Sequence, residues 1–498
     1  MGIKSFGGKI YAKSVAKKVR NEALKAVELQ EKTLVTLIGK ARQTAFGSDH
    51  NFDEVKTHAD FVKHVPLRDY EGHKPYVDRI IEGEKDVLWP GVPAYFCKTS
   101  GTTSGAKYIP LTKESVPFHI KAAKNALLCY IAETGNSKFL DGKMMFLQGS
   151  PVLDKKINIP VGRLSGITAH WVPGYLQKNR MPTWETNCIE DWEKKVDAVV
   201  DETKTADMRL ISGIPSWVQM YFERLLEVTG KKTVAEVFPG FSLFVYGGLN
   251  YAPYRAIFKK LIGKEVPSVE TYPASEGFIA FQDSQTQPGL LLNTNAGMFF
   301  EFVPADEINN ENPTRLTLAQ VKKDVHYAII LSTNAGLWAY NIGDKIKFVS
   351  LNPYRIVVTG RVSHFISAFG EHVIAEEAES AMKETLDQFD AQVREFHVAP
   401  QVSPAQGKPY HEWFVEFETE PHNMERFSSF LNELMCSKNP YYKDLIEGNI
   451  LRPLVVSKVK RNGFVEMMKS RGKLGGQNKI PRLADDRKIA DFMEVYKV

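Results

Sequence analysis

The stretch from Thr99 to Lys107 combines hydroxyl side chains, two glycines and a lysine within a few positions. Glycines let backbone N–H groups approach an anion, hydroxyls donate further hydrogen bonds, and a lysine adds positive charge. The apolar run Val92–Lys98 before it predicts a strand, and the residues from Thr112 onward predict a helix. A flexible polar turn has a similar composition. The threonines and the Ile109-Pro110-Leu111 that follows favour a phosphate-binding loop between a strand and a helix.

This loop does not have the spacing of the nucleotide-binding P-loop. That motif needs four residues between its first glycine and an adjacent Gly-Lys-Ser/Thr. Here three residues separate Gly101 from Gly105, Ala106 separates Gly105 from Lys107, and Tyr108 follows the lysine. The loop therefore has to be understood together with other motifs of the chain.

The second motif is Tyr272-Pro273-Ala274-Ser275-Glu276-Gly277, which follows a predicted buried strand. An aromatic ring at this place can cover a purine, a hydroxyl can contact phosphate, and a carboxylate can hold Mg2+. The structural alternative is a strand-end turn with a solvated glutamate.

Three further motifs carry single charged groups. In Trp338–Asp344, the carboxylate of Asp344 follows a glycine and can accept hydrogen bonds from both hydroxyls of a ribose. In Gly360-Arg361, the arginine is a fixed cation that can reach ribose or phosphate. In 475–482, a glycine-bearing loop presents Lys479. Taken alone, a turn aspartate explains Asp344 equally well, and a surface arginine and a solvated lysine explain Arg361 and Lys479 better, so the weight lies in the order of the motifs.

The elements around these motifs predict a layered α/β fold. Phe241–Tyr246 is a continuous apolar run, as expected of a parallel strand buried on both faces, and it ends in Gly247-Gly248. A helix over 254–262 and a strand over Val269–Tyr272 follow. Ligands of such sheets bind at the carboxyl ends of the strands. We therefore expect Gly105, Gly247 and Tyr272 at such ends.

The remaining pattern predicts two domains. A helix is expected over 14–45, and four short strands between 298 and 359 form a β-rich section that ends at the hinge Gly360-Arg361. Beyond it, a helix over 374–389, a strand over 412–418 and a helix over 424–437 predict a small α+β domain. The domains are expected to be a large α/β domain over residues 1–361 and a mobile cap over 362–498.

Composition excludes several classes of protein. The 498 residues carry a net charge of only +5, without a dense basic patch, which disfavours nucleic-acid binding. The four cysteines are far apart, which argues against a zinc site or a disulfide framework and fits the cytoplasm. The first residues lack the apolar core of a signal peptide, and Phe6 breaks the myristoylation pattern. No apolar run approaches the ~18 residues of a membrane span, so no membrane association is expected.

The five motifs, in this order, resemble those of the adenylate-forming enzymes. The variants in 272–276, 334–344 and 477–482 are similar to the GH3 acyl-acid amido synthetase family (auxin-responsive promoter family) in particular. There the first loop reads roughly Ser-Ser-Gly-Thr-Ser/Thr-Gly-Gly, with a proline a few positions on. The resemblance covers nearly the whole chain. It implies an adenylate-forming fold and a two-step reaction, in which a carboxylic acid and MgATP form an acyl-adenylate and pyrophosphate, and an amine, typically an amino acid, then displaces AMP.

The resemblance also implies roles for single residues. The residues implied to contact ATP or AMP are Ser100, Gly101, Thr102, Thr103, Gly248, Tyr272, Ser275, Asp344, Arg361 and His372. Tyr272 would pack near the adenine, and Asp344 would bind the ribose hydroxyls. Glu276 would hold Mg2+, and Lys479 would neutralise charge on the α-phosphate as pyrophosphate leaves.

Two departures bear on these roles. GH3 proteins often carry a lysine after an acidic residue beyond the hinge, whereas here Glu371 is followed by His372, and a neutral histidine would weaken a phosphate contact or make it pH-dependent. Many thioester-forming relatives read Gly-Arg-x-Asp-x-x-Ile-Lys at the hinge, whereas this chain has Ser363 and Ser367 at the Asp and Lys positions. The missing lysine favours a free amine over coenzyme A as the acceptor. The alternatives are an acyl-CoA synthetase-like ligase and a nucleotide-binding protein without turnover.

Overall fold

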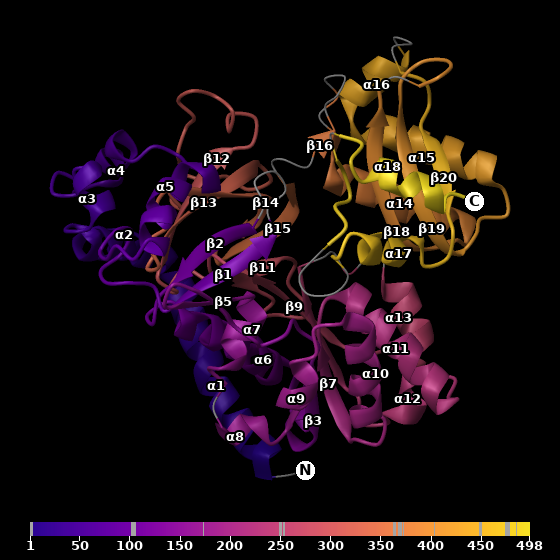
Figure 1. Ribbon diagram of the computed structural model, residues 1–498, viewed down its shortest axis with the longest axis horizontal. Coiled ribbons are helices and arrows are strands. Elements are labelled where there is room, and N and C mark those ends of the chain that lie inside the picture. Colours follow the sequence, from indigo (N-terminus) through magenta and orange to yellow (C-terminus); the bar gives the residue numbers. More distant parts are fainter. Residues whose placement is uncertain are drawn as a thin grey trace. The chain divides into compact units, whose positions relative to one another are not determined.

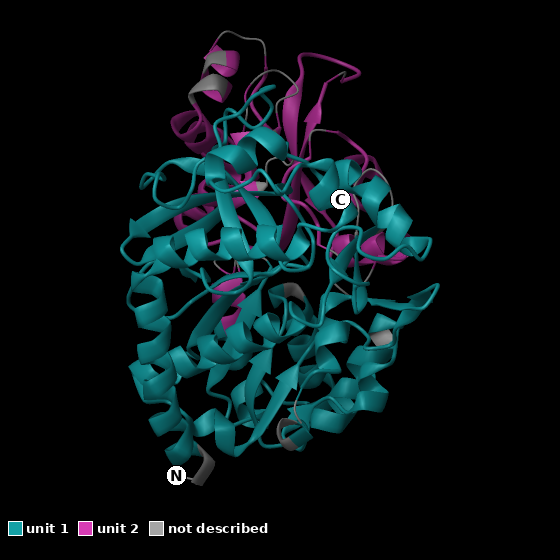
Figure 2. Ribbon diagram, turned by 90° about the vertical axis from the view of Figure 1, so that its left-hand side faces the viewer, with its two compact units in different colours: residues 1–249, 259–358 teal, residues 250–258, 359–498 magenta. Residues whose placement is uncertain are grey.

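The chain divides into two compact units in a computed structural model (Figures 1 and 2). Unit 1 comprises residues 1–249 and 259–358, and unit 2 comprises residues 250–258 and 359–498. The described residues are 3–100, 106–172, 174–248, 251, 254–361, 365–366, 371, 373–402, 404–447, 451–473, 479–484 and 486–498. The domain boundary expected after residue 361 stays a prediction.

A large mixed sheet forms the centre of unit 1. Among the described residues it has eleven strands, in the spatial order β12 (Met298–Pro304), β13 (His326–Thr333), β14 (Tyr340–Leu351), β15 (Tyr354–Arg361), β11 (Leu290–Leu292), β10 (Phe278–Phe281), β9 (Ser268–Pro273), β8 (Leu243–Gly247), β7 (Met208–Ser212), β3 (Lys143–Phe146) and β6 (Arg180–Met181). The strands from β6 to β9 pair in parallel, and those from β9 to β11 pair antiparallel. The predicted α/β architecture is confirmed.

The parallel half of the sheet follows from alternating apolar strands and helices. Leu243 and Phe244 of β8 are buried, and β8 pairs on one side with β7 and on the other with β9. The long helix α6 (Val116–Thr134) packs on β9 and β10, while α2 (Ala26–Ala41) packs on β12 and β13. The carboxyl ends of β3, β7, β8 and β9 consequently share one edge of the sheet.

A smaller sheet holds the first motif, and here the expectation of a strand–loop–helix unit is wrong. β1 (Tyr95–Ser100) and β2 (Ala106–Leu111) form an antiparallel hairpin, and β5 (Ile159–Gly162) and β4 (Asp154–Lys156) complete the sheet in the order β2-β1-β5-β4. Ile109, Pro110 and Leu111 are all buried, and the residues after the loop pair with β1 along their whole length instead of starting a helix. The helix begins only at Val116.

Helices cover the sheets of unit 1. The predicted helix over 14–45 is two helices, because α1 (Ile3–Leu24) ends before Lys25 and α2 begins at Ala26. Ala12, Ala16 and Val19 of α1 are buried in the same hydrophobic cluster as residues of α6. The other helices are α3 (Ala45–Asp49), α4 (His58–His64), α5 (Tyr70–Ile81), η1 (Lys138–Asp141), α7 (Leu164–Ala169), α8 (Gly174–Gln177), α9 (Trp184–Asn187), α10 (Trp192–Thr203), α11 (Pro215–Thr229) and α12 (Val234–Val237). The helix α13 (Arg255–Ile262) is divided between the units, since its residues 255–258 belong to unit 2 and 259–262 belong to unit 1.

Unit 2 is an α+β unit around a three-stranded sheet. β18 (Gln392–Gln401), β19 (Tyr410–Thr419) and β20 (Val455–Val459) form this sheet in that order. The remaining elements are β16 (Phe365–Ile366), β17 (Val373–Ile374), α14 (Ala375–Phe389), α15 (Met424–Lys438), α16 (Pro440–Glu447), α17 (Gly463–Ser470), α18 (Ala490–Met493) and η3 (Glu494–Tyr496). α14 and α15 pack on each other, and the fully buried Phe427 and Leu431 belong to the same hydrophobic cluster as Trp413.

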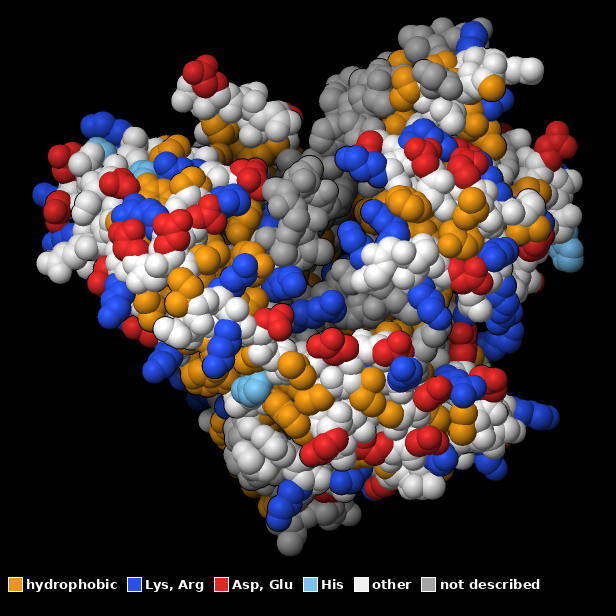
Figure 3. Space-filling model, viewed as in Figure 1, with side chains coloured by type: hydrophobic (Ala, Val, Ile, Leu, Met, Phe, Trp, Pro, Cys, Tyr) orange, Lys and Arg blue, Asp and Glu red, His pale blue; other side chains and the backbone are white. Residues whose placement is uncertain are grey.

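On the face in Figure 3, acidic and basic side chains are interspersed over the lower part of unit 1. Within the described ranges, every helix is too short or too polar to cross a bilayer.

Candidate functional site

The site is built at the carboxyl ends of β8 and β9. The end of β8 lies so close to β9 that a Cβ on Gly247 would fall 2.5 Å from the carbonyl oxygen of Thr271, and therefore only glycine fits. Gly248 has a φ of +82°, a left-handed conformation that favours glycine. The two glycines thus allow the chain to leave the sheet directly beside the Tyr272 motif.

The second and third motifs meet in the structure. The Tyr272 hydroxyl donates a hydrogen bond to Asp344 Oδ2, across 72 residues of sequence. Tyr272 lies on β9 and Asp344 on β14, and the Tyr272 ring packs in the main hydrophobic cluster of unit 1. The contact orients one oxygen of the Asp344 carboxylate.

Buried aromatic residues support the segment before Asp344. The Trp338 indole donates to Leu88 O at 3.1 Å, and the Trp338 backbone N–H donates to Nε2 of His73 at 3.2 Å. His73 is fully buried, and burial lowers its pKa to about 4, so the ring is the neutral acceptor that this hydrogen bond needs. The structural role of His73 had no signal in the sequence, because its partner is a backbone group 265 residues away.

The first and second motifs also lie side by side. The Cys97 thiol of β1 donates to Ser275 Oγ at 3.1 Å, and both side chains are buried. Burial raises the pKa of the Cys97 thiol to about 12, and the charge of Glu276 contributes in the same direction. Since Cys97 stands three residues before Ser100, the loop after β1 begins next to the turn that carries Ser275 and Glu276.

Glu276 occupies the turn between β9 and β10. Ala274 and Gly277 exchange backbone hydrogen bonds across this turn, at 2.9 and 3.2 Å. Within the described residues, no group of three or more His, Cys, Asp or Glu side chains could hold a metal ion. A single carboxylate fits Mg2+, which usually takes one or two carboxylates and completes its shell with water and phosphate oxygens.

The predicted phosphate loop is described only at its start. The backbone of Ser100 pairs with Ala106 at the end of the β1–β2 hairpin. Gly101, Thr102 and Thr103 lie outside the described residues, as does Gly105.

The other predicted site residues belong to unit 2. Lys479 is exposed, and three residues later Arg482 is buried. The Arg482 guanidinium pairs with Glu395 and with Glu379, at 3.2 Å for the latter, and it lies 4.5 Å from the centre of the Phe396 ring. The chain is therefore anchored on β18 directly after the lysine. Arg361 ends β15, and His372, Ser363 and Ser367 lie outside the described residues.

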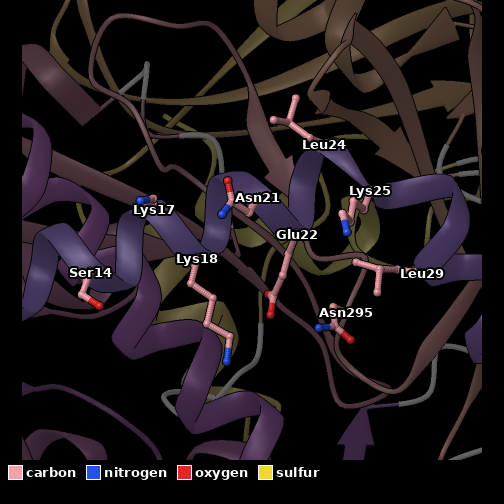
Figure 4. Close-up of a pocket in the computed structure, with 9 residues that line it drawn as sticks. All are labelled: Ser14, Lys17, Lys18, Asn21, Glu22, Leu24, Lys25, Leu29 and Asn295. Carbon is pink, nitrogen blue, oxygen red and sulfur yellow. The ribbon is translucent and has the colours of Figure 1, made fainter.

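A separate pocket lies where α1 meets α2 (Figure 4). It has a volume of about 580 Å³ and is lined by Ser14, Lys17, Lys18, Asn21, Glu22, Leu24, Lys25, Leu29 and Asn295. This lining shares no residue with the five motifs.

Comparison with known proteins gives three matches along the chain. The GH3 family N-terminal domain matches residues 15–198, the GH3 family central domain matches residues 291–361, and the GH3 family C-terminal domain matches residues 376–488. These matches include or adjoin the first motif, the Asp344 motif, the hinge and Lys479.

Curated relatives are distant in sequence. A jasmonoyl–L-amino acid synthetase of Nicotiana attenuata is 20% identical over 389 residues, which cover 65% of this chain and 66% of that protein. An indole-3-acetic acid-amido synthetase of Arabidopsis thaliana is 26% identical over 209 residues, which cover 39% of this chain and 35% of that protein. The matches thus span less than two thirds of either relative.

Solved structures share the fold over almost the full length. The GH3.15 acyl acid amido synthetase superposes with a TM-score of 0.82 at 16% identity, over 98% of this chain and 96% of that one. A 2-hydroxyisobutyryl-CoA ligase superposes with a TM-score of 0.61 at 12% identity, over 93% of this chain and 90% of that one. With the three matched domains covering most of its length, the chain belongs to the GH3 family.

Proposed function

We propose that this chain is an ATP-dependent ligase that adenylates a carboxylic acid and then transfers the acyl group to an amine, in particular an amino acid. The products are an amide, AMP and pyrophosphate. The observation that carries the proposal is the hydrogen bond from Tyr272 to Asp344, because it brings the predicted adenine and ribose contacts together.

The nucleotide would bind along the carboxyl ends of β8 and β9. In this proposal Tyr272 packs near the adenine and Asp344 accepts hydrogen bonds from the ribose hydroxyls, with Gly248 giving room for the backbone to approach. Ser275 and the loop residues Ser100, Gly101, Thr102 and Thr103 are assigned to the phosphates. The contact between Cys97 and Ser275 supports this assignment, because it sets the start of the loop beside the second motif.

Glu276 would hold Mg2+ together with phosphate oxygens. When bound, the ion supplies neutralisation of charge on the phosphates. The chain's own contribution is a single carboxylate that the turn between β9 and β10 fixes in place.

Unit 2 would supply the remaining charges. We assign Lys479 to the charge that develops on the α-phosphate as pyrophosphate leaves, and Arg361 and His372 to contacts with the bound nucleotide. Such roles need unit 2 to act as a mobile cap, which is part of the proposal.

The substrates are proposed to be a small carboxylic acid and an amino acid or another amine. The two curated relatives support this class, since their names describe the joining of jasmonic or indole-3-acetic acid to an amino acid or amido group. The serines at positions 363 and 367 support an amine rather than coenzyme A. Four free cysteines, two of them buried, suit a reducing compartment such as the cytoplasm.

The test has two stages on the purified full chain. First, carboxylic acids are screened for ATP–pyrophosphate exchange, which a binding protein without turnover cannot give with any acid. Second, the enzyme is loaded with an accepted acid and MgATP, and AMP release is followed after adding coenzyme A or a pool of amino acids. Acceleration by amino acids supports the proposal, whereas acceleration by coenzyme A alone would show the acceptor to be wrong.

A further inference from the structure

A buried lysine lies beside the turn that follows β3, at the same sheet edge as Gly247. Lys195 of α10 is 2% exposed, and its ammonium donates to the carbonyl oxygens of Gln148, at 3.0 Å, and Asn187, at 2.7 Å. An ammonium has three N–H groups, so one remains after these two bonds. The pKa of Lys195 is lowered to about 8, mainly by burial and in smaller part by the nearby charge of Arg163, while Cys188 opposes the shift.

Arg163 brings a second cation to the same turn. A Cβ on Gly149 would lie 3.0 Å from Cδ of Arg163 and 3.5 Å from Oγ of Ser165, so both side chains touch the turn. Burial lowers the pKa of the Arg163 guanidinium. Glu190 attracts this guanidinium, and within the described residues Arg163 has neither an ion pair nor a side-chain hydrogen bond.

Two neutral donors at this turn are also unused. Gln148 Nε2 and Ser165 Oγ are buried and have no hydrogen-bond partner among the described residues. The acceptor Asn187 Oδ1 is likewise unpaired, but one neutral acceptor does not balance two cations. Buried donors are almost always paired in proteins, and a group of them that remains unpaired indicates a missing anion or water.

We propose that Arg163, Lys195, Gln148 and Ser165 form a subsite for a carboxylate group. The planar guanidinium suits bidentate binding of a carboxylate and would fill two of its about four lone-pair sites, while the third N–H of Lys195 and the two neutral donors are available for the others. This inference rests on the proposed function, because it names a substrate contact of that reaction.

The carboxylate bound at this subsite is a different group from the carboxylate that is adenylated. β3 is separated from β9 by β7 and β8, and three strand spacings place the turn after β3 about 14 Å from the strand of Tyr272. Two sources offer a carboxylate at a distance from the adenylated carbon. One is the acceptor amino acid, and the other is a second carboxylate on the acid substrate.

The experiment compares substrates that differ only in that carboxylate. For the acceptor, AMP release is measured with amino acids and their decarboxylated amines, such as glycine against methylamine and leucine against 3-methylbutylamine. For the acid, ATP–pyrophosphate exchange is measured with dicarboxylic and monocarboxylic acids of equal length, such as glutarate against pentanoate. The pair that the wild type discriminates identifies the source.

Arg163→Gln is expected to remove that discrimination. The KM of the carboxylate-bearing partner should rise by about tenfold to a hundredfold, as expected for one charge-assisted pair, while the KM of its analogue stays unchanged. Arg163→Lys should keep part of the preference. Arg209→Gln is the matched control, since this arginine of β7 lies at the opposite sheet edge and pairs with Asp207.

Ser165→Ala separates binding from folding. Its hydroxyl has no partner in the described part of the chain, so its loss should leave the melting temperature unchanged while raising the same KM severalfold. If Arg163→Gln and Ser165→Ala discriminate both substrate pairs as the wild type does, or if the wild type discriminates neither, the subsite is refuted. If the wild type shows no ATP–pyrophosphate exchange with any acid, the proposed function fails. In that case, calorimetry of glycine and glutarate binding to the wild type and to Arg163→Gln tests the subsite by itself.

Discussion

Replacing Asp344 by alanine tests the centre of the proposed nucleotide site. In the structure the Asp344 carboxylate accepts a hydrogen bond from Tyr272, and in the proposal it also accepts one from each ribose hydroxyl. Asp344→Ala removes all of these acceptors and leaves the backbone of β14 in place. We expect ATP affinity to fall by tenfold or more.

The magnitude follows from the hydrogen bonds lost. A hydrogen bond to a charged group contributes roughly 1.5–3 kcal/mol, so the two ribose contacts contribute at most ~6 kcal/mol. Asp344 is only half-buried, and water replaces part of this loss. The value of a single contact, ~1.5 kcal/mol, is therefore the lower bound, and it corresponds to about tenfold in affinity.

The assay is calorimetric binding of ATP and of 2′,3′-dideoxy-ATP to the wild type and the variant. The wild type should prefer ATP, and Asp344→Ala should bind both nucleotides equally weakly. Tyr272→Phe is the control, because it removes the hydroxyl that orients Asp344 and keeps the ring, and we expect a loss of ~1 kcal/mol or less. A variant that binds ATP like the wild type, or that still distinguishes the two nucleotides, would refute the ribose assignment.

Three further predictions concern single residues. Lys479→Ala should slow ATP–pyrophosphate exchange by ~10²-fold with ATP affinity nearly intact, and normal exchange kinetics would remove this lysine from the mechanism. His73 is neutral in the folded state with a pKa of about 4, against 6.5 unfolded, so its protonation favours unfolding as the pH falls. Between pH 7 and 5 this effect should lower the free energy of unfolding, measured by urea denaturation, by ~2 kcal/mol. His73→Gln should flatten this dependence on pH. Iodoacetamide should label Cys188 and spare Cys97, because the Cys97 thiol is fully buried with a pKa of about 12. The labelling is measured by mass spectrometry of tryptic peptides. Labelling of Cys97 before Cys188 would contradict the buried contact with Ser275.

Local patterns predicted the parallel half of unit 1 well. The continuous apolar run at β8 and the helix after it are signals that depend only on neighbouring residues, and both are confirmed. The motif order led to the correct family for the same reason, since each motif is a short stretch that does not depend on its surroundings.

Contacts between distant segments could not be predicted in this way. Cys97 and Ser275 are separated by 178 residues, and no pattern in either stretch indicates that they touch. The residues after the first loop were interpreted as the approach to a helix, although they form the strand β2, whose ladder partner β1 lies on the other side of the loop. β18 was not predicted, because its burial comes from packing in unit 2 and not from a regular alternation along the strand.

The division of the chain has a consequence for how the protein is made and dissected. Residues 250–258 follow β8 and precede β9 of unit 1, yet they belong to unit 2, where the buried Tyr254 donates to Glu395 at 3.3 Å. During synthesis Tyr254 leaves the ribosome some 140 residues before its partner, so unit 2 cannot be completed until β18 has been translated. A gene cut after residue 358 would leave Tyr254 in one fragment and Glu395 in the other. The two units are therefore nested along the chain, and neither can be obtained whole from one continuous segment.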